Sequence, residues 1–197
     1  YIGDWSSDVC SSDLQQQQKR RLQARQQQQQ QQLGAPPPPA AAVFLDFQKA
    51  YDTVARSFLF AVMEAVGAGE GMLAWARLLL SDTAAAAVVN GNISPQEHWL
   101  AGVRQGCPLA PAMYLFVAWA LSCWLRTVPE VGVWMGAARV CAPQYADDTT
   151  PLLRACTAQG VEALLAALHT FAQASGQRLN TAKSKVLPVG PHPLEAA

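Results

Sequence analysis

Two adjacent carboxylates, Asp147 and Asp148, stand between the short apolar segments 141–142 and 152–153. Apolar runs on both sides of a polar pair predict a β-hairpin with the two carboxylates at its tip. A third carboxylate, Asp46, ends an apolar run that reads as a buried strand. An isolated buried charge is costly, and adjacent carboxylates repel each other. A divalent cation bound at these strand ends would remove both problems, because Mg²⁺ prefers carboxylate oxygens. An Asp-Asp pair by itself is also typical of a plain polar turn.

From residue 41 onward, strand-like and helix-like patterns intermingle without a strict βαβ alternation, which predicts an α+β layer fold. We expect strands at 41–45, at 86–89 with a tight turn at Asn90-Gly91, in a returning segment that reaches about Leu100, in short pieces within 132–145, and at 185–189. We expect helices around 59–66, ending near Gly67, and at 70–80, 112–126 and 161–171.

Residues 1–40 differ in composition from the rest of the chain. The segment 1–14 has no periodicity and is similar to translated adapter sequence, so it is excluded from fold reasoning. A glutamine-rich stretch and the proline run 36–39 follow. Such segments bury too little apolar surface to offset chain entropy, so we expect a disordered tail, with a glutamine helix as the alternative. The expected domain spans 41–190, and 191–197 form a second tail.

Composition constrains the function less than the motifs do. Hydrophobic residues make up 51% of the 197 residues, which is ample for a core, and the formal net charge is zero, which favours neither binding nor avoidance of nucleic acid. The 5 cysteines form no Cys-x-x-Cys pair, so we expect free thiols in a reducing compartment. The chain carries no recognisable signal peptide, and we expect a nuclear or cytoplasmic, non-secreted protein.

The stretch 105–125 is uncharged and needs a membrane check. A membrane-spanning helix needs about 20 apolar residues. Pro108 and Pro111 break the first part of this stretch, and the apolar remainder is too short to span a bilayer. We therefore expect a buried core helix and no membrane partner.

Four clusters carry the chemistry, and they occur in a fixed order along the chain: F-L-D-F-Q-K-A-Y-D at 44–52, G-V-R-Q-G-C-P-L-A-P at 102–111, Y-A-D-D at 145–148, and S-G-Q-R-L-N at 175–180 with K-S-K at 183–185. Together they resemble the reverse transcriptase family, and in their wording the branch found in non-LTR (LINE-type) retrotransposons. The resemblance covers roughly 41–190. It implies the palm domain of that family, an antiparallel sheet with helices packed on one face.

The resemblance implies an RNA-directed DNA polymerase that works by two-metal nucleotidyl transfer. Asp46 and Asp147 would hold two Mg²⁺ ions, with Mn²⁺ as a substitute, and Asp148 would lie beside them. The main-chain carbonyl of Phe47 would complete a metal shell. Lys183 would donate a proton to pyrophosphate, although an ordinary surface lysine is the alternative reading. The partners implied are an RNA template, a DNA primer and deoxynucleoside triphosphates.

The resemblance also implies a substrate site. Tyr51 would lie under the incoming sugar and exclude a 2′-hydroxyl; without the motif it reads as a core aromatic. Gln105 and Gly106 would pass the template and the nucleotide closely, because glycine lacks a Cβ. Arg104 would touch phosphate, or be a solvated surface arginine. Tyr145 of the Y-A-D-D motif completes the expected substrate-binding set.

Departures from the family pattern are also visible. Glutamine and proline tracts occupy the place of the basic fingers residues, and the residues after 190 could not form a thumb. We therefore expect fingers and thumb to be largely missing and the isolated fragment to be inactive. Pro151 cannot donate a hydrogen bond, so the second hairpin strand is expected to be short, bulged or at an edge. A group II intron-type reverse transcriptase, and an inactive remnant that binds nucleic acid or a protein partner, remain as alternatives. The oligomeric state is left open.

Overall fold

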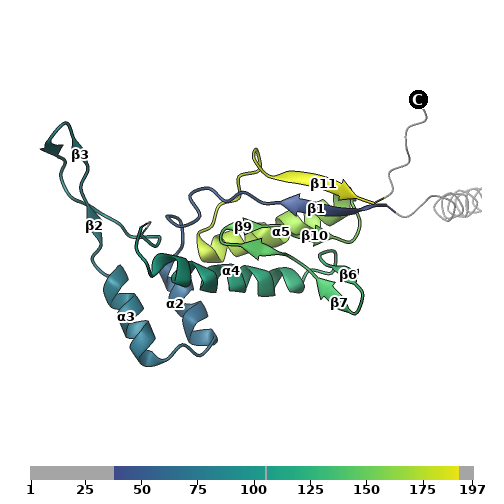
Figure 1. Ribbon diagram of the computed structural model, residues 1–197, viewed down its shortest axis with the longest axis horizontal. Coiled ribbons are helices and arrows are strands. Elements are labelled where there is room, and N and C mark those ends of the chain that lie inside the picture. Colours follow the sequence, from purple (N-terminus) through teal and green to yellow (C-terminus); the bar gives the residue numbers. More distant parts are fainter. Residues whose placement is uncertain (1–37, 105, 191–197) are drawn as a thin grey trace, which may run out of the picture. The chain divides into compact units, whose positions relative to one another are not determined.

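The computed structural model describes residues 38–104 and 106–190, and in this part of the chain a three-stranded antiparallel sheet organises the fold (Figure 1). Its order is β10 (Leu152–Leu153), β1 (Ala40–Phe44), β11 (Lys185–Val189). Along β1 the side chains of Ala41 and Val43 are buried, whereas Phe44 is 47% exposed. Successive side chains of a strand point to opposite faces, so one face of β1 faces the core.

A separate two-stranded hairpin lies next to this sheet and is linked to it by a bridge between Leu45 and Thr149. It consists of β8 (Gln144–Tyr145) and β9 (Asp148–Thr149). Pro151, which is fully buried, separates β9 from β10 and limits each to two residues, so the expectation of a short strand is confirmed. The expectation of an edge position is also confirmed, because β10 is an edge strand of the three-stranded sheet. The Pro151 carbonyl accepts the Val43 N–H at 2.9 Å on one side, while the neighbouring Leu152 N–H donates to the Cys141 carbonyl on the other.

Four helices pack with the sheet around one apolar cluster: α2 (Arg56–Ala65), α3 (Glu70–Leu80), α4 (Ala110–Arg126) and α5 (Ala158–Ser175). All four lie where the apolar periodicity predicts helices. α4 begins two residues before the expected start, because Pro111 in its first turn needs no N–H partner there. The Thr157 hydroxyl caps α5 by accepting the Gly160 N–H, and Gly176 ends the helix in the left-handed conformation, φ 76°.

α4 is the buried core helix that the sequence predicts. Its buried residues include Val117, Leu121 and Leu125, and the last of these is fully inaccessible. Among the helices of the described residues, none combines the length and the apolar character that crossing a bilayer requires. The four cysteines in the described part of the chain are free thiols, as expected, and Cys10 lies outside it.

Residues 83–99, called the arm below, are built differently. The arm holds four two-residue strands: β2 (Ala84–Ala85), β3 (Val88–Val89), β4 (Asn92–Ile93) and β5 (Glu97–His98). The predicted turn is confirmed, with φ 51° at Asn90 and 79° at Gly91. The prediction of one returning strand to Leu100 is wrong. Pro95, which lacks an N–H, lies between β4 and β5, and the second ladder ends at His98.

Two glycines from different parts of the chain pack tightly against the backbone of the turn at 49–56. A Cβ on Gly102, φ 81°, would lie 2.5 Å from the Asp52 carbonyl oxygen. A Cβ on Gly176 would collide with the Thr53 carbonyl oxygen. Both positions combine a left-handed backbone with backbone-to-backbone contact, so a side chain is excluded at each for two independent reasons. A further hairpin, β6 (Val133–Met135) with β7 (Ala138–Val140), matches the strand-like pieces expected after residue 132.

Candidate functional site

The strand register brings the three expected carboxylates to one end of the sheet. β1 pairs with the hairpin strand antiparallel, with Ala41 opposite Leu153 and Ala42 opposite Leu152, and a bridge joins Leu45 to Thr149. In antiparallel strands the residue number rises on one strand as it falls on the other. All three pairs follow this rule without a shift, so the register is the same throughout. Continued by one and two residues, this register places positions 46 and 47 opposite positions 148 and 147. Asp46 and Asp147 are half-buried, and Asp148 is exposed.

The main chain around Asp46 is fixed on its other side by the segment 179–184. The Asp46 N–H donates to the Ser184 hydroxyl at 3.2 Å, and the Asp46 carbonyl accepts the Asn180 N–H at 2.8 Å. The Ser184 hydroxyl also donates to the Asn180 carbonyl, which closes the segment on itself. In the K-S-K cluster the serine is therefore the residue that fixes the main chain of Asp46.

Backbone alternation aims the Phe47 carbonyl at the hairpin. Val43 and Leu45 direct their N–H groups to the hairpin strand. The Asp46 carbonyl and the Gln48 N–H bond the opposite segment, the latter reaching the Arg178 carbonyl at 2.7 Å. Neighbouring residues of a strand alternate in this respect, so the main-chain groups of Phe47 turn toward the hairpin tip. The Phe47 side chain is buried.

The hairpin tip is strained. Ala146 and Asp147 form the turn, and Asp148 is already paired with Tyr145, so only one of the two carboxylates lies at the very tip. Ala146 has φ 54°, a left-handed conformation that costs an L-residue roughly 1–2 kcal/mol. Lys49, in the turn after Asp46, has φ 48°. Such outliers cluster at functional sites, because the surrounding structure must hold them in place.

Tyr51 belongs to an aromatic pair beside the carboxylates. Its ring stacks on that of Tyr114 from α4, with centroids 4.6 Å apart and planes at 20°. Burial and, secondarily, the negative charge of Asp147 raise the pKa of Tyr51 above its usual range. The pKa of Tyr114 is raised for the same two reasons, with a smaller contribution from Tyr51. The charge of Asp147 therefore acts on both rings.

A cavity of about 390 Å³ opens beside this pair and is lined by Tyr51, Gly106, Ala110 and Pro111. Gly106 has φ 85°, and no atom of the described chain lies within 4 Å of the place a Cβ would take, so the loop is open on that side. Gln105, predicted to contact the template, lies outside the described residues.

Three further predicted residues lie at the surface. The side chains of Arg104 and Lys183 are exposed, and that of Tyr145 is 85% exposed. In the described part of the chain, no three His, Cys, Asp or Glu side chains lie close enough together to hold a metal ion. The donor types nevertheless suit a hard cation, because the register places carboxylate-bearing residues and the Phe47 carbonyl at the same end of the sheet.

Comparison with known proteins decides the family. A family model described as reverse transcriptase (RNA-dependent DNA polymerase) matches residues 7–192. The chain belongs to the reverse transcriptase family. It is 30% identical over 143 residues to a Retrovirus-related Pol polyprotein from type-1 retrotransposable element R2 of Popillia japonica, covering 72% of this chain and 20% of that protein. It is 31% identical over 142 residues to the type-2 element R2DM polyprotein of Drosophila melanogaster, covering 71% and 13%.

A third relative is the Transposon TX1 uncharacterized 149 kDa protein of Xenopus laevis, at 27% identity over 144 residues, 73% of this chain and 11% of that protein. These relatives confirm the resemblance to non-LTR retrotransposon proteins, and this reverse transcriptase chain spans a fifth or less of their length. Among solved structures, apo telomerase from Candida tropicalis matches with a TM-score of 0.58 at 11% identity, covering 95% of this chain and 36% of that one. This match shows a reverse transcriptase-like fold.

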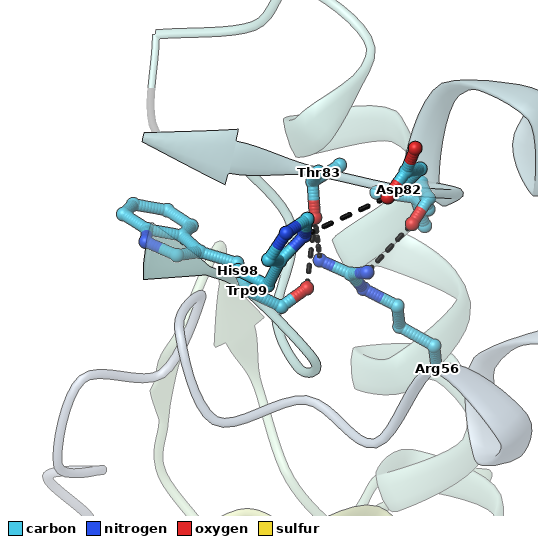
Figure 2. Close-up of polar contacts among 6 residues, drawn as sticks. Arg56, Asp82, Thr83, His98 and Trp99 are labelled. Carbon is cyan, nitrogen blue, oxygen red and sulfur yellow. Dashed lines mark hydrogen bonds and ion pairs between the residues drawn. The ribbon is translucent and has the colours of Figure 1, made fainter. Parts of the chain in front are cut away.

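Sequence reasoning missed Arg56, which anchors the loop of this reverse transcriptase that begins at Gly102. Its guanidinium donates to the Gly102 carbonyl at 3.1 Å, the Leu80 carbonyl at 2.6 Å and the Thr83 hydroxyl at 2.8 Å. Figure 2 shows this group beside Thr83, whose hydroxyl reaches the Trp99 carbonyl, with the ion pair of Asp82 and His98 nearby.

A signal for Arg56 was present in the sequence. It is the first residue of α2, where a positive charge opposes the helix dipole. Burial and then the nearby charge of Arg104 lower the pKa of Arg56 below its usual value. Tyr114 and Gln177 were also missed. Gln177 stands in the S-G-Q-R-L-N cluster, which marked the segment but gave no role to this residue, and a tyrosine in an apolar helix carries no signal of its own.

Proposed function

We propose that residues 41–190 form the palm of an RNA-directed DNA polymerase, which extends a DNA primer on an RNA template. The register that sets Asp46 and the Phe47 carbonyl opposite the Asp147-Asp148 hairpin carries this proposal. Two carboxylate-bearing strand ends and a carbonyl oxygen at one sheet end suit phosphoryl-transfer chemistry. Membership in the reverse transcriptase family supports it independently.

In this proposal Asp46, Asp147 and the Phe47 carbonyl hold the divalent cations that the family generally uses, Mg²⁺ or Mn²⁺ in its place, with Asp148 beside them. When bound, such ions would activate the attacking 3′-hydroxyl and stabilise the leaving group. Ser184 and Asn180 keep the Asp46 backbone in register. The left-handed conformation of Ala146 forms the tight turn from which Asp147 is presented, and the surrounding structure must hold it in place.

The cavity beside Tyr51 is the proposed nucleotide site. The Tyr51 ring forms its floor and excludes a 2′-hydroxyl, and Gly106 leaves room for the nucleotide. Arg104 and Gln105 of the same loop contact phosphate and template, and Tyr145 contacts the primer–template side of the hairpin. Lys183 protonates the departing pyrophosphate. A nuclear or cytoplasmic location remains a prediction.

Primer extension tests the function. A version of the protein that contains this domain is supplied with an annealed RNA template, a DNA primer, Mg²⁺ and deoxynucleotides. We expect extension, and we expect Tyr51→Val to raise the use of ribonucleotides relative to deoxynucleotides, because the clash with the 2′-hydroxyl is lost. Binding of primer–template without any extension would instead support a non-catalytic remnant. Unchanged sugar discrimination would return Tyr51 to the role of a core aromatic.

A further inference from the structure

The Gln177 side chain is buried, although it is polar and lies in an irregular segment just after α5. It is 2% exposed, and its amide uses both ends. The Nε2 group donates to the Ala50 carbonyl at 2.6 Å, and Oε1 accepts the Tyr114 hydroxyl at 3.1 Å. Burying a polar side chain in this way is tolerated only because its hydrogen bonds are made.

The two groups held by Gln177 both determine where Tyr51 lies. Ala50 is the residue before Tyr51, so its carbonyl belongs to the peptide that sets the Tyr51 backbone. Tyr114 is the ring on which Tyr51 stacks, and it is 3% exposed. One amide therefore fixes the backbone of Tyr51 and the aromatic surface behind it.

Gln177 is itself held firmly. The Ala55 N–H donates to the Ser175 carbonyl at 2.8 Å, and the Gln177 N–H donates to the Ser175 hydroxyl at 3.2 Å. Gly176 packs directly on the Thr53 carbonyl. The end of α5 is thus docked on the turn that carries Tyr51, and the amide has little freedom to move away from its partners.

We propose that Gln177 is a specificity-positioning residue, which holds the Tyr51 ring in place for discrimination between deoxyribose and ribose. The inference rests on the proposed function of Tyr51. An amide suits the position because it donates and accepts at once at any pH, whereas an ionised carboxylate only accepts and an aliphatic side chain does neither. The side-chain hydrogen bonds of Gln177 go to Ala50 and Tyr114, which are neither proposed metal ligands nor residues of the cavity lining, so we expect its effect on sugar choice.

The first measurement uses a version of the protein that extends primers. Gln177→Leu is expected to lower the preference for deoxynucleotides over ribonucleotides by roughly tenfold, the equivalent of one lost hydrogen bond, while kcat for deoxynucleotides changes less. Gln173→Leu is the matched control, because Gln173 lies exposed on the same helix end. In a Tyr51→Val background, Gln177→Leu is expected to add no further loss, since the positioned ring is already absent.

A conservative variant separates positioning from bulk packing. Gln177→Glu keeps the shape, and its neutral carboxylic acid can still donate to the Ala50 carbonyl. Sugar discrimination in this variant is expected to improve as the pH falls, because protonation restores the donor. The parent and Gln177→Leu are expected to lack this added pH dependence.

The second measurement needs no activity and uses the 197-residue chain. Its 4 tyrosines are replaced by 3-fluorotyrosine and observed by ¹⁹F NMR, with Tyr51→Val to assign the Tyr51 line and the exposed Tyr145 as an internal reference. Gln177→Leu and Tyr114→Phe are expected to shift the Tyr51 line toward that of Tyr145, and Gln173→Leu is expected to leave it in place.

The outcomes distinguish the two proposals. A Tyr51 line that does not move in Gln177→Leu and Tyr114→Phe, or a full additional loss of discrimination in the Tyr51→Val background, overturns the role of Gln177. A line that moves as expected in a protein that extends no primer supports the positioning by Gln177 and counts against the polymerase function alone.

Discussion

The turn at 49–56 and the arm at 83–99 use the same unusual backbone conformation with different residues. Within the described chain, four residues other than glycine have positive φ. Two of them, Asp82 and Asn90, lie in or next to the arm and are of types that tolerate this conformation. The other two, Lys49 and Ala146, flank the candidate site and are of types that do not. Strain is thus concentrated at the site, while the arm is locally relaxed.

The two regions also differ in what holds them. The turn at 49–56 is held from separate parts of the chain. Gly102 and Gly176 pack against its backbone, and Gln177 donates a hydrogen bond to it. In the arm every residue from 85 to 99 is exposed, including Val88 at 69% and Ile93 at 73%. A two-stranded ribbon by itself is marginally stable in water. Tertiary packing therefore defines the site, whereas turn chemistry and Arg56 define the arm.

The largest expected effect is on nucleotide incorporation, and it distinguishes the candidate site from the arm. Asp147→Asn keeps the shape of the hairpin turn but removes a charge from the proposed metal site, so nucleotide incorporation should fall by about a hundredfold or more. Asp82→Asn likewise removes one carboxylate charge, but next to the arm and away from the proposed metal site. It should leave incorporation within about twofold. Single-nucleotide incorporation rates measure both. Near-normal rates for Asp147→Asn would refute the metal assignment.

Stability should differ between two left-handed glycines. Gly176→Ala meets the Thr53 carbonyl as well as an unfavourable φ, and we expect a loss of about 3 kcal/mol in the free energy of unfolding. Gly91→Ala, at φ 79° in open space, should lose about 1 kcal/mol. Urea denaturation measures both. Equal losses would mean that the contact of Gly176 with the turn contributes nothing.

Two arginines test whether the arm depends on its anchor. Arg56→Met removes donors to the Leu80, Thr83 and Gly102 acceptors and should cost about 2 kcal/mol. Arg77→Met removes an exposed ion pair with Glu64 and should cost less than about 1 kcal/mol. Hydrogen exchange at the Trp99 amide, which bonds the Thr83 carbonyl, should accelerate only in Arg56→Met. Exchange unchanged by Arg56→Met would separate the arm from this anchor.

The smallest effect concerns strain itself. Ala146→Gly removes the cost of the left-handed conformation but raises the conformational entropy of the unfolded chain. We expect a net gain of about 0.5–1 kcal/mol in the free energy of unfolding. Asn90→Gly, where the native residue already tolerates the conformation, should give no gain. Thermal midpoints compare the two. A gain at position 90 and none at 146 would reverse the proposed distribution of strain.

Elements with a strong local signal were predictable from the sequence. The 70–80 helix and the 185–189 strand match the structure, and so does the Asn90-Gly91 turn, because periodicity and turn residues are local properties. The returning strand was misjudged, because Pro95 breaks the pairing and the arm has no packed face that fixes a register. Pro151 was correctly predicted to give a short strand at an edge, whereas the pairing of that strand with β1 depends on residues far away in sequence.

The candidate site divides in the same way. Asp46, Asp147 and Tyr51 stand in recognisable motifs, and the structure brings their strands and loops to one end of the sheet. The supporting residues Tyr114, Gln177 and Arg56 act through contacts between segments 24 to 127 positions apart. No local pattern encodes such a contact, so the roles of these residues became visible only in three dimensions.

Gly102 and Gly176 also predict how copies of the gene change once selection on the domain is lost. Neither takes part in the proposed chemistry, yet each admits no side chain without displacing the turn that bears Tyr51. Copies of this gene still selected for a folded product should retain both glycines, even if their catalytic carboxylates have been replaced. Copies that have lost the glycines while keeping the carboxylates should encode a markedly less stable domain, so the order in which these codons decay tells which property was lost first.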